Sequence, residues 1–179
     1  SGTTYLYAQW NSASVKLPTA TLPGYTFLGW YDAATGGNKI GGAGDSYTPT
    51  AAKTLYAHWQ ANKITVKFSG NGATSGSMTD QVFTYDTAQA LKSNGFSRAY
   101  TVTYNGNFAG KTPTLGATSQ TATYTFKNWN NAAAGNGSYT YTNGQTVTNP
   151  NGATSGTTYL YAQWNSASVK LPTATLPGY

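Results

Sequence analysis

Alternating hydrophobic and polar residues run through several short segments of this chain. Ile64, Val66 and Phe68 alternate with polar neighbours, and residues 55–59 and 100–104 alternate in the same way. Successive side chains of a strand point to opposite faces, so a two-residue period predicts β-strands with one buried face. The pattern therefore predicts a mainly β protein.

One further segment, residues 25–31 (Tyr-Thr-Phe-Leu-Gly-Trp-Tyr), has large side chains at nearly every position. Strict alternation places Tyr25, Phe27 and Tyr31 on one face and Trp30 on the other. A strand with bulky residues on both sides is typical of a central position in a sheet or of burial between two layers. We therefore predict a central strand here.

Asn-Gly pairs mark the expected turns. Six of them occur, at 71–72, 94–95, 105–106, 136–137, 143–144 and 151–152. Both residues of the pair tolerate a positive φ, which the tight turns of β-hairpins require. The pair at 105–106 directly follows the expected strand 100–104, so it is predicted to form a hairpin turn.

A single short helix is predicted, from Asp86 to Ser93. Asp86 or Thr87 is suited to cap its first turn, the alanines and Leu91 that follow favour helix, and Asn-Gly at 94–95 would end it. Eight residues form a marginal helix that depends on packing. The predicted fold class is mainly β, with at most one short helix in each repeat of the sequence.

That repeat is the most informative feature of the chain. Residues 1–25 and 155–179 are identical letter for letter, at an offset of 155 − 1 = 154 residues. Identity this complete indicates recent duplication or selection for uniform copies, and it should be interpreted before any other signal. We therefore expect an extended array of tandem modules, with a parent protein that continues in both directions.

A shorter repeat lies inside the 154-residue period. The motif Tyr-Thr-Phe-x-x-Trp is followed by Leu-Tyr-Ala-x-Trp, and the two tryptophans are Trp30 and Trp59 in one unit and Trp129 and Trp164 in the other. Trp10 closes the first Leu-Tyr-Ala-x-Trp motif of the chain, which is expected to be the tail of a preceding repeat. The sequence thus predicts two modules in each period.

These motifs resemble the Listeria–Bacteroides repeat family, which is related to the B-repeats of internalin-type proteins. The resemblance is carried by Val-Lys-Phe at 66–68, Asn-Gly at 71–72, Gly-Tyr-Thr-Phe-Leu-Gly-Trp-Tyr at 24–31 and the Leu-Tyr-Ala-x-Trp segments. It implies β-grasp-like modules strung in arrays on bacterial surface proteins, in an extracellular location at the cell surface. It implies no enzymatic activity.

The resemblance also suggests the module boundaries. We expect a tail of the preceding repeat at 1–11, a truncated module at 12–61, an extended module at 62–165 and the start of the next repeat at 166–179. The truncated module lacks the leading strand and helix of the family's full module. The extended one contains the short helix near 86–93 and an additional segment from 100 to 121.

Charge and composition exclude several classes of partner. The net charge is +6, from 10 Lys and Arg against 4 acidic residues, but the basic residues are scattered and no two are adjacent. Nucleic-acid-binding surfaces usually show clustered Lys and Arg, so no nucleic-acid partner is expected. The chain has no cysteine, which excludes disulfides and thiolate metal sites. No apolar run approaches the length that spans a bilayer, so no membrane insertion is expected.

Residues with catalytic chemistry are few. His58 is the only histidine, and the matching position of the other motifs holds Gln9 and Gln163, which suits a solvent-facing polar residue better than a catalyst. The four acids are widely separated: Asp32, Asp45, Asp80 and Asp86. We therefore predict no catalytic, cofactor-binding or metal-binding residues, no cofactor, and a protein that is not an enzyme.

The aromatic residues permit two interpretations. Exposed Trp and Tyr side chains could stack on sugar rings, whereas tryptophans that recur once per motif could each fill the core of a small module. We favour the core for Trp10, Trp30, Trp59, Trp129 and Trp164. The expected function is a structural segment of a surface stalk or fibre, with neighbouring repeats, like chains and wall or host glycans as expected partners. The alternative is an adhesin-type binding module.

Overall fold

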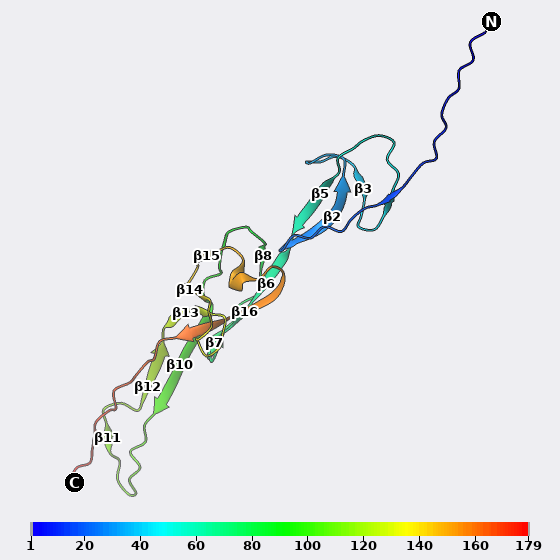
Figure 1. Ribbon diagram of the computed structural model, residues 1–179. Helices are drawn as coiled ribbons and strands as arrows, with labels where there is room; N and C mark the ends of the chain where they lie inside the picture. Colours follow the sequence, from blue (N-terminus) through cyan, green and yellow to red (C-terminus); the bar gives the residue numbers. More distant parts are fainter. Residues whose placement is uncertain (1, 179) are drawn as a thin grey trace. The chain divides into compact units, whose positions relative to one another are not determined.

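The computed structural model describes residues 2–178, and the chain divides into two compact units at the boundary between Asn62 and Lys63 (Figure 1). Both units are built from short β-strands, so the predicted mainly β class is confirmed. The one helical element in the described part of the chain is a single 3-10 turn, η1 (Pro150–Gly152).

The first unit contains a three-stranded antiparallel sheet with the order β3-β2-β5. Its strands are β2 (Tyr25–Tyr31), β3 (Lys39–Gly41) and β5 (Tyr56–Ala61). β2 pairs on both edges, as predicted for this segment. Beside the sheet, the two-residue strands β1 (Val15–Lys16) and β4 (Ser46–Tyr47) pair with each other.

The second unit is larger and contains a five-stranded sheet with the order β14-β13-β16-β6-β8. Its strands are β6 (Lys63–Ser69), β8 (Gln81–Thr84), β13 (Phe126–Asn130), β14 (Thr140–Tyr141) and β16 (Gly156–Trp164). The neighbouring strands β6 and β16 run parallel, and every other pair in this sheet is antiparallel.

The remaining strands of the second unit form three further sets. β10 (Phe96–Thr103) pairs with β12 (Ser119–Tyr124) and with β7 (Ser75–Gly76). β9 (Gln89–Ala90) pairs with β15 (Thr146–Val147), and β11 (Thr114–Leu115) pairs with β17 (Ala174–Thr175).

The hydrophobic core of the second unit lies on this five-stranded sheet. Its buried members come from strands β6, β8, β13, β14, β15 and β16 together with Leu91, and they are Ile64, Val66, Phe83, Leu91, Trp129, Tyr141, Val147, Leu160 and Ala162. The Trp129 ring is fully buried and packs against Phe68 and Phe126, each with a ring-centroid distance of 5.0 Å. The core is therefore centred on one of the repeated tryptophans.

The two units share one strand pair with the same register. In the first unit Phe27 lies opposite Trp59 in the β2–β5 pair, and in the second Phe126 lies opposite Trp164 in the β13–β16 pair. Each pair shifts register immediately after its phenylalanine, as a β-bulge does. The bulge overrides strict alternation, since Trp30 contacts Phe27 edge-to-face at 5.5 Å and does not face away from it.

The predicted helix from Asp86 to Ser93 is wrong. Asp86 has a φ of 56°, which no right-handed helix accepts, and residues 89–90 form strand β9. The backbone N–H of Leu91 donates to Gln145 O at 2.9 Å. The Gln81 side chain binds the carbonyl of Ala90 and the N–H of Lys92, each at 2.8 Å. Contacts with distant strands thus take the backbone groups that a helix would have used.

The predicted hairpin turn at Asn105-Gly106 is also wrong. β10 and β12 do form an antiparallel hairpin, but they are joined by the long loop 104–118. A bond from Tyr104 N to Thr118 O closes that loop at 2.9 Å. A tight Asn-Gly turn does occur at Asn71-Gly72, where φ is 46° and 86°, and Ala73 N donates to Gly70 O across it.

Candidate functional site

Two of the four acidic side chains, Asp32 and Asp45, bind the backbone of local loops. Asp32 Oδ1 accepts the backbone N–H of Asn38 at 2.7 Å, and its carboxylate lies 3.8 Å from Lys53 Nζ. The backbone N–H of Asn38 holds the pKa of Asp32 below its usual value, since it stabilises the charged form. Asp45 Oδ2 accepts the N–H of Gly42 at 2.6 Å. Both carboxylates therefore close turns in the first unit.

The other two acids pair with side chains from other segments of the second unit. Asp80 lies 3.5 Å from Lys67 Nζ, and Asp86 is paired with Asn149, whose Nδ2 donates to Asp86 Oδ1 at 2.8 Å. Residues 2–178 contain no group of three or more His, Asp or Glu side chains that could hold a metal ion. They also contain no helix long and apolar enough to cross a membrane.

His58 and Gln163 occupy matching positions and make matching bonds. His58 Nε2 lies 2.9 Å from Ala33 O, and Gln163 Nε2 donates to Ala132 O and Ala133 O at 3.3 Å. In each unit the side chain thus binds the loop that follows the repeated Trp strand. The His58 ring also stacks on Tyr31 at 3.8 Å. The sequence suggested a solvent-facing polar residue at this position, but His58 and Gln163 are half-buried and each binds a backbone carbonyl.

The five repeated tryptophans differ in burial. Trp129 is fully buried, whereas Trp30, Trp59 and Trp164 are half-buried. Trp30 Nε1 donates to Pro18 O at 2.8 Å and Trp164 Nε1 to Gly70 O at 3.0 Å. Trp10 is 89% exposed, so the prediction that it fills a core is wrong for this chain.

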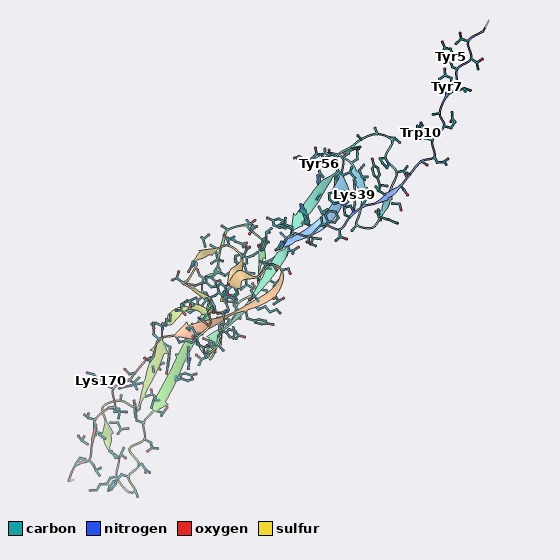
Figure 2. The ribbon with its side chains drawn as sticks, viewed as in Figure 1. Tyr5, Tyr7, Trp10, Lys39, Tyr56 and Lys170 are labelled. Carbon is teal, nitrogen blue, oxygen red and sulfur yellow. The ribbon has the colours of Figure 1, made fainter. Side chains whose placement is uncertain are left out.

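The duplicated sequence lies in two different structural environments, one at each end of the chain. Residues 156–164 form β16, in the interior of the five-stranded sheet, where Leu160 is fully buried. The same sequence at residues 2–10 forms no strand, and Leu6, which matches Leu160, is 95% exposed. Figure 2 shows Tyr5, Tyr7 and Trp10 along this segment with no strand beside them.

The second half of the duplicated sequence shows the opposite preference. In the first unit Val15–Lys16 pairs with β4, and Leu17 is buried with its N–H bonded to Asp45 O at 2.9 Å. The matching Leu171 is 81% exposed, and its neighbourhood pairs instead with β11 through β17. Each half of the duplicated sequence is buried in the one unit that supplies its partner strands.

Comparison with known protein families finds a match over the first part of the chain. The Listeria–Bacteroides repeat domain matches residues 2–58, from the unpaired segment to the second Leu-Tyr-Ala-x-Trp motif. This chain carries a Listeria–Bacteroides repeat. The repeat therefore contains the exposed copy of the strand sequence together with β1 to β4 and the first part of β5.

The chain is also similar to Internalin H of Listeria monocytogenes serovar 1/2a, with 46% identity over 72 residues. That stretch covers 40% of this chain and 12% of Internalin H. No solved structure matches the chain. The sequence motifs quoted above thus identified the repeat family correctly.

Proposed function

We propose that this chain is a structural segment of a bacterial cell-surface stalk or extracellular fibre, built from tandem modules with a period of 154 residues (155 − 1 = 154) and without catalysis. The observation that carries the proposal is the duplicated sequence. Its first half completes the sheet of the second unit, and its second half supplies β1 and the buried Leu17 of the first. A sequence that ends one module and begins the next is what every junction of a tandem array requires.

Two further observations support this proposal. The likeness to Internalin H and to the repeat domain favours an extracellular location at the surface of a bacterium. The strand order β13-β16-β6-β8, with its two inner strands parallel, supports a β-grasp-like module that has lost its helix. Neighbouring repeats of the same chain are then its first partners.

A solution experiment tests the stalk. Chains carrying one, two and four periods are compared by small-angle X-ray scattering. Identical junctions repeat the same geometry at every step, so the maximum dimension is expected to rise in proportion to the number of periods. The proposal would be wrong if the maximum dimension grew only with the square root of the number of periods, as it does for a flexible coil, or if four periods formed a compact particle.

The second candidate function is an adhesin-type module that binds glycans or host proteins. It rests on exposed aromatic side chains of the β10–β12 hairpin, Tyr100 on β10 and Phe108 in the loop. Rings of this kind can stack on sugar faces. Screening the chain on a glycan array would support this candidate if a signal appeared and disappeared in Tyr100→Ala and Phe108→Ala. If these variants and the parent chain all give no signal, the structural role stands alone.

A further inference from the structure

Arg98, the one arginine of the chain, lies on β10 and packs on aromatic rings. Its Cζ lies 4.7 Å from the centre of the Tyr124 ring and 5.6 Å from that of the Tyr100 ring. A Cβ built at Gly72 would lie 3.3 Å from the same Cζ, so the turn at Asn71-Gly72 also lies against the guanidinium. Two rings and a turn therefore hold this cation in place.

The neighbours of Arg98 are themselves anchored. In the β10–β12 pair (Figure 1), Arg98 lies opposite Tyr124 and Tyr100 follows two residues along β10, so the three side chains share one face of the hairpin. The two tyrosine rings meet edge-to-face at 5.8 Å, and the Tyr100 hydroxyl donates to Gly72 O at 3.4 Å. The turn is fixed by Asn71, whose Nδ2 donates to a carbonyl of β16 at 2.9 Å. The cation and its surroundings are therefore preorganised for a ligand.

The Arg98 guanidinium has no acceptor among residues 2–178. It makes no hydrogen bond or ion pair there, and its Nε is buried without a partner. Both acids of the second unit have other partners, Asp80 a lysine and Asp86 an asparagine. The N–H donors of a guanidinium lie in its plane, so rings stacked over it leave them unused. A fork of coplanar donors matches a carboxylate, which it binds through two parallel hydrogen bonds.

Apolar surface is exposed beside this cation. Tyr100 is 45% exposed, and Val102, the next residue of β10 on the same face, is 41% exposed. Gln120 lies opposite Val102 and adds a polar amide at the same end of the hairpin. An exposed aromatic ring among hydrogen-bonding groups suits a sugar, whose ring has an apolar face and polar hydroxyls. An acidic sugar would satisfy both the cation and the ring.

We propose that Arg98, Tyr100 and Tyr124 form a binding site for saccharides that carry a carboxylate. Arg98 pairs with the carboxylate, and the sugar ring lies against Tyr100. This inference rests on the second candidate function above, the adhesin-type module, and names its class of ligand. The site lies outside residues 2–58, which match the family's repeat domain. It is therefore a feature of the β10–β12 hairpin and not of the matched repeat.

A titration of the full chain with matched probes tests the ligand class. Trigalacturonate is compared with its neutral methyl ester, and 3′-sialyllactose with neutral lactose, by NMR chemical-shift changes. We expect the preferred acidic probe to bind about tenfold or more tightly than its neutral match, to shift residues 98–100 and 120–124, and to weaken with added salt. The proposal is wrong if neither acidic probe binds, if each binds no better than its neutral match, or if the shifts lie elsewhere.

Variants then separate the charge from the ring. Arg98→Gln should lose the preference for the acidic probe, and Arg98→Lys should retain part of it, because a lysine keeps the charge without the planar fork. Tyr100→Leu should weaken the acidic and neutral probes by the same factor. Thr101→Val, on the opposite face of β10, is the matched control and should bind as the parent chain does. Amide exchange in β10 and β12 shows that each variant keeps the hairpin.

The outcomes distinguish this site from the broader functions. A folded Arg98→Gln chain that still prefers the acidic probe would overturn the proposal. If binding survives in Arg98→Gln and is lost in Phe108→Ala, the adhesin-type function holds at the loop and the site at Arg98 is wrong. The comparison of acidic and neutral probes on the parent chain needs no variant, so it decides the ligand class even if a substitution unfolds the hairpin. The scattering test of the stalk is independent of all these results.

Discussion

The two units of this chain place the same strand pair in very different surroundings. In both, the phenylalanine of one strand faces a tryptophan of the next, the same bulge follows, and a polar side chain ties the pair to the following loop. Of the buried hydrophobic residues in the described structure, however, only Leu17 belongs to the first unit. The motif fixes local geometry in both units, while burial depends on what packs beside it.

Strands β6 and β8 supply three of the nine buried core residues of the second unit. They contribute Ile64, Val66 and Phe83 to the core of the second unit, and each of these is fully buried. In the first unit, β5 has no strand on its outer edge within residues 2–178. We therefore expect a parallel strand on that edge to stabilise the module.

The largest expected effect comes from separating the units. We expect residues 62–165 expressed alone to fold cooperatively and residues 12–61 alone to remain unfolded, because so small a unit has too little core to stand by itself. Amide exchange on each piece measures the outcome. If the 12–61 piece is protected and unfolds cooperatively, the β2–β5 pair and Leu17 are enough for independent folding. The two units would then not differ in their ability to fold alone.

A smaller difference is expected between the matching tryptophans. Trp129→Ala should destabilise the second unit by about 3–5 kcal/mol, the usual cost of removing a large buried ring. Trp30→Ala should cost the first unit about 1–2 kcal/mol, since its ring is half-exposed and it gives up one hydrogen bond to Pro18 O. Denaturant titration followed by amide exchange assigns each loss to its unit. Equal losses of stability in the two variants would mean that the difference in burial between Trp129 and Trp30 has no energetic consequence.

The smallest expected effect concerns pH. The loop of the first unit is held by the Asp32 carboxylate, which accepts Asn38 N–H, while the second unit uses the neutral Asn131, whose Oδ1 accepts Tyr139 N–H at 3.1 Å. The pKa of Asp32 is lowered by folding, so its contribution is present above its ordinary value of 3.8 and is lost as the pH falls through the folded-state value.

Asp32→Asn is the matched control for this prediction, because it gives the first unit the amide that the second unit already has. The melting temperature of the first unit should fall less in acid for Asp32→Asn than for the parent chain, between about pH 6 and about pH 2. The second unit should respond identically in both proteins. Parallel acid responses of the first unit in both proteins would show that Asp32 contributes nothing there.

The sequence was most informative where contacts are local. Alternation located β6, and large side chains at nearly every position located the central strand β2. The duplicated segment and the paired tryptophans identified the repeat. The exposed Trp10 could not be foreseen from its motif, since burial of the identical Trp164 depends on strands from elsewhere in the chain. Local identity determines which contacts a segment can make, and the surroundings determine which it does make.

The failed predictions share this cause. Residues 86–93 have fair helix propensity, but pairing of β9 with β15 and the Gln81 side chain engage their backbone, and propensity is too weak to compete with such contacts. The bulge after Phe27 likewise inverted the predicted face of Trp30. The pairing of His58 with Ala33 O also depends on a loop from another part of the unit, which no local pattern reveals.

The direction of the paired strands has a mechanical consequence for a chain pulled from both ends. In the second unit, force would enter at Lys63 on β6 and leave after Trp164 on β16, at opposite ends of two parallel strands. Their hydrogen bonds are then loaded together, in shear. In the first unit, Tyr25 lies opposite Ala61 in an antiparallel pair, so once β1 has separated from β4 the same force would open β2–β5 one bond at a time. Under tension the first unit would lengthen the chain while the second still held.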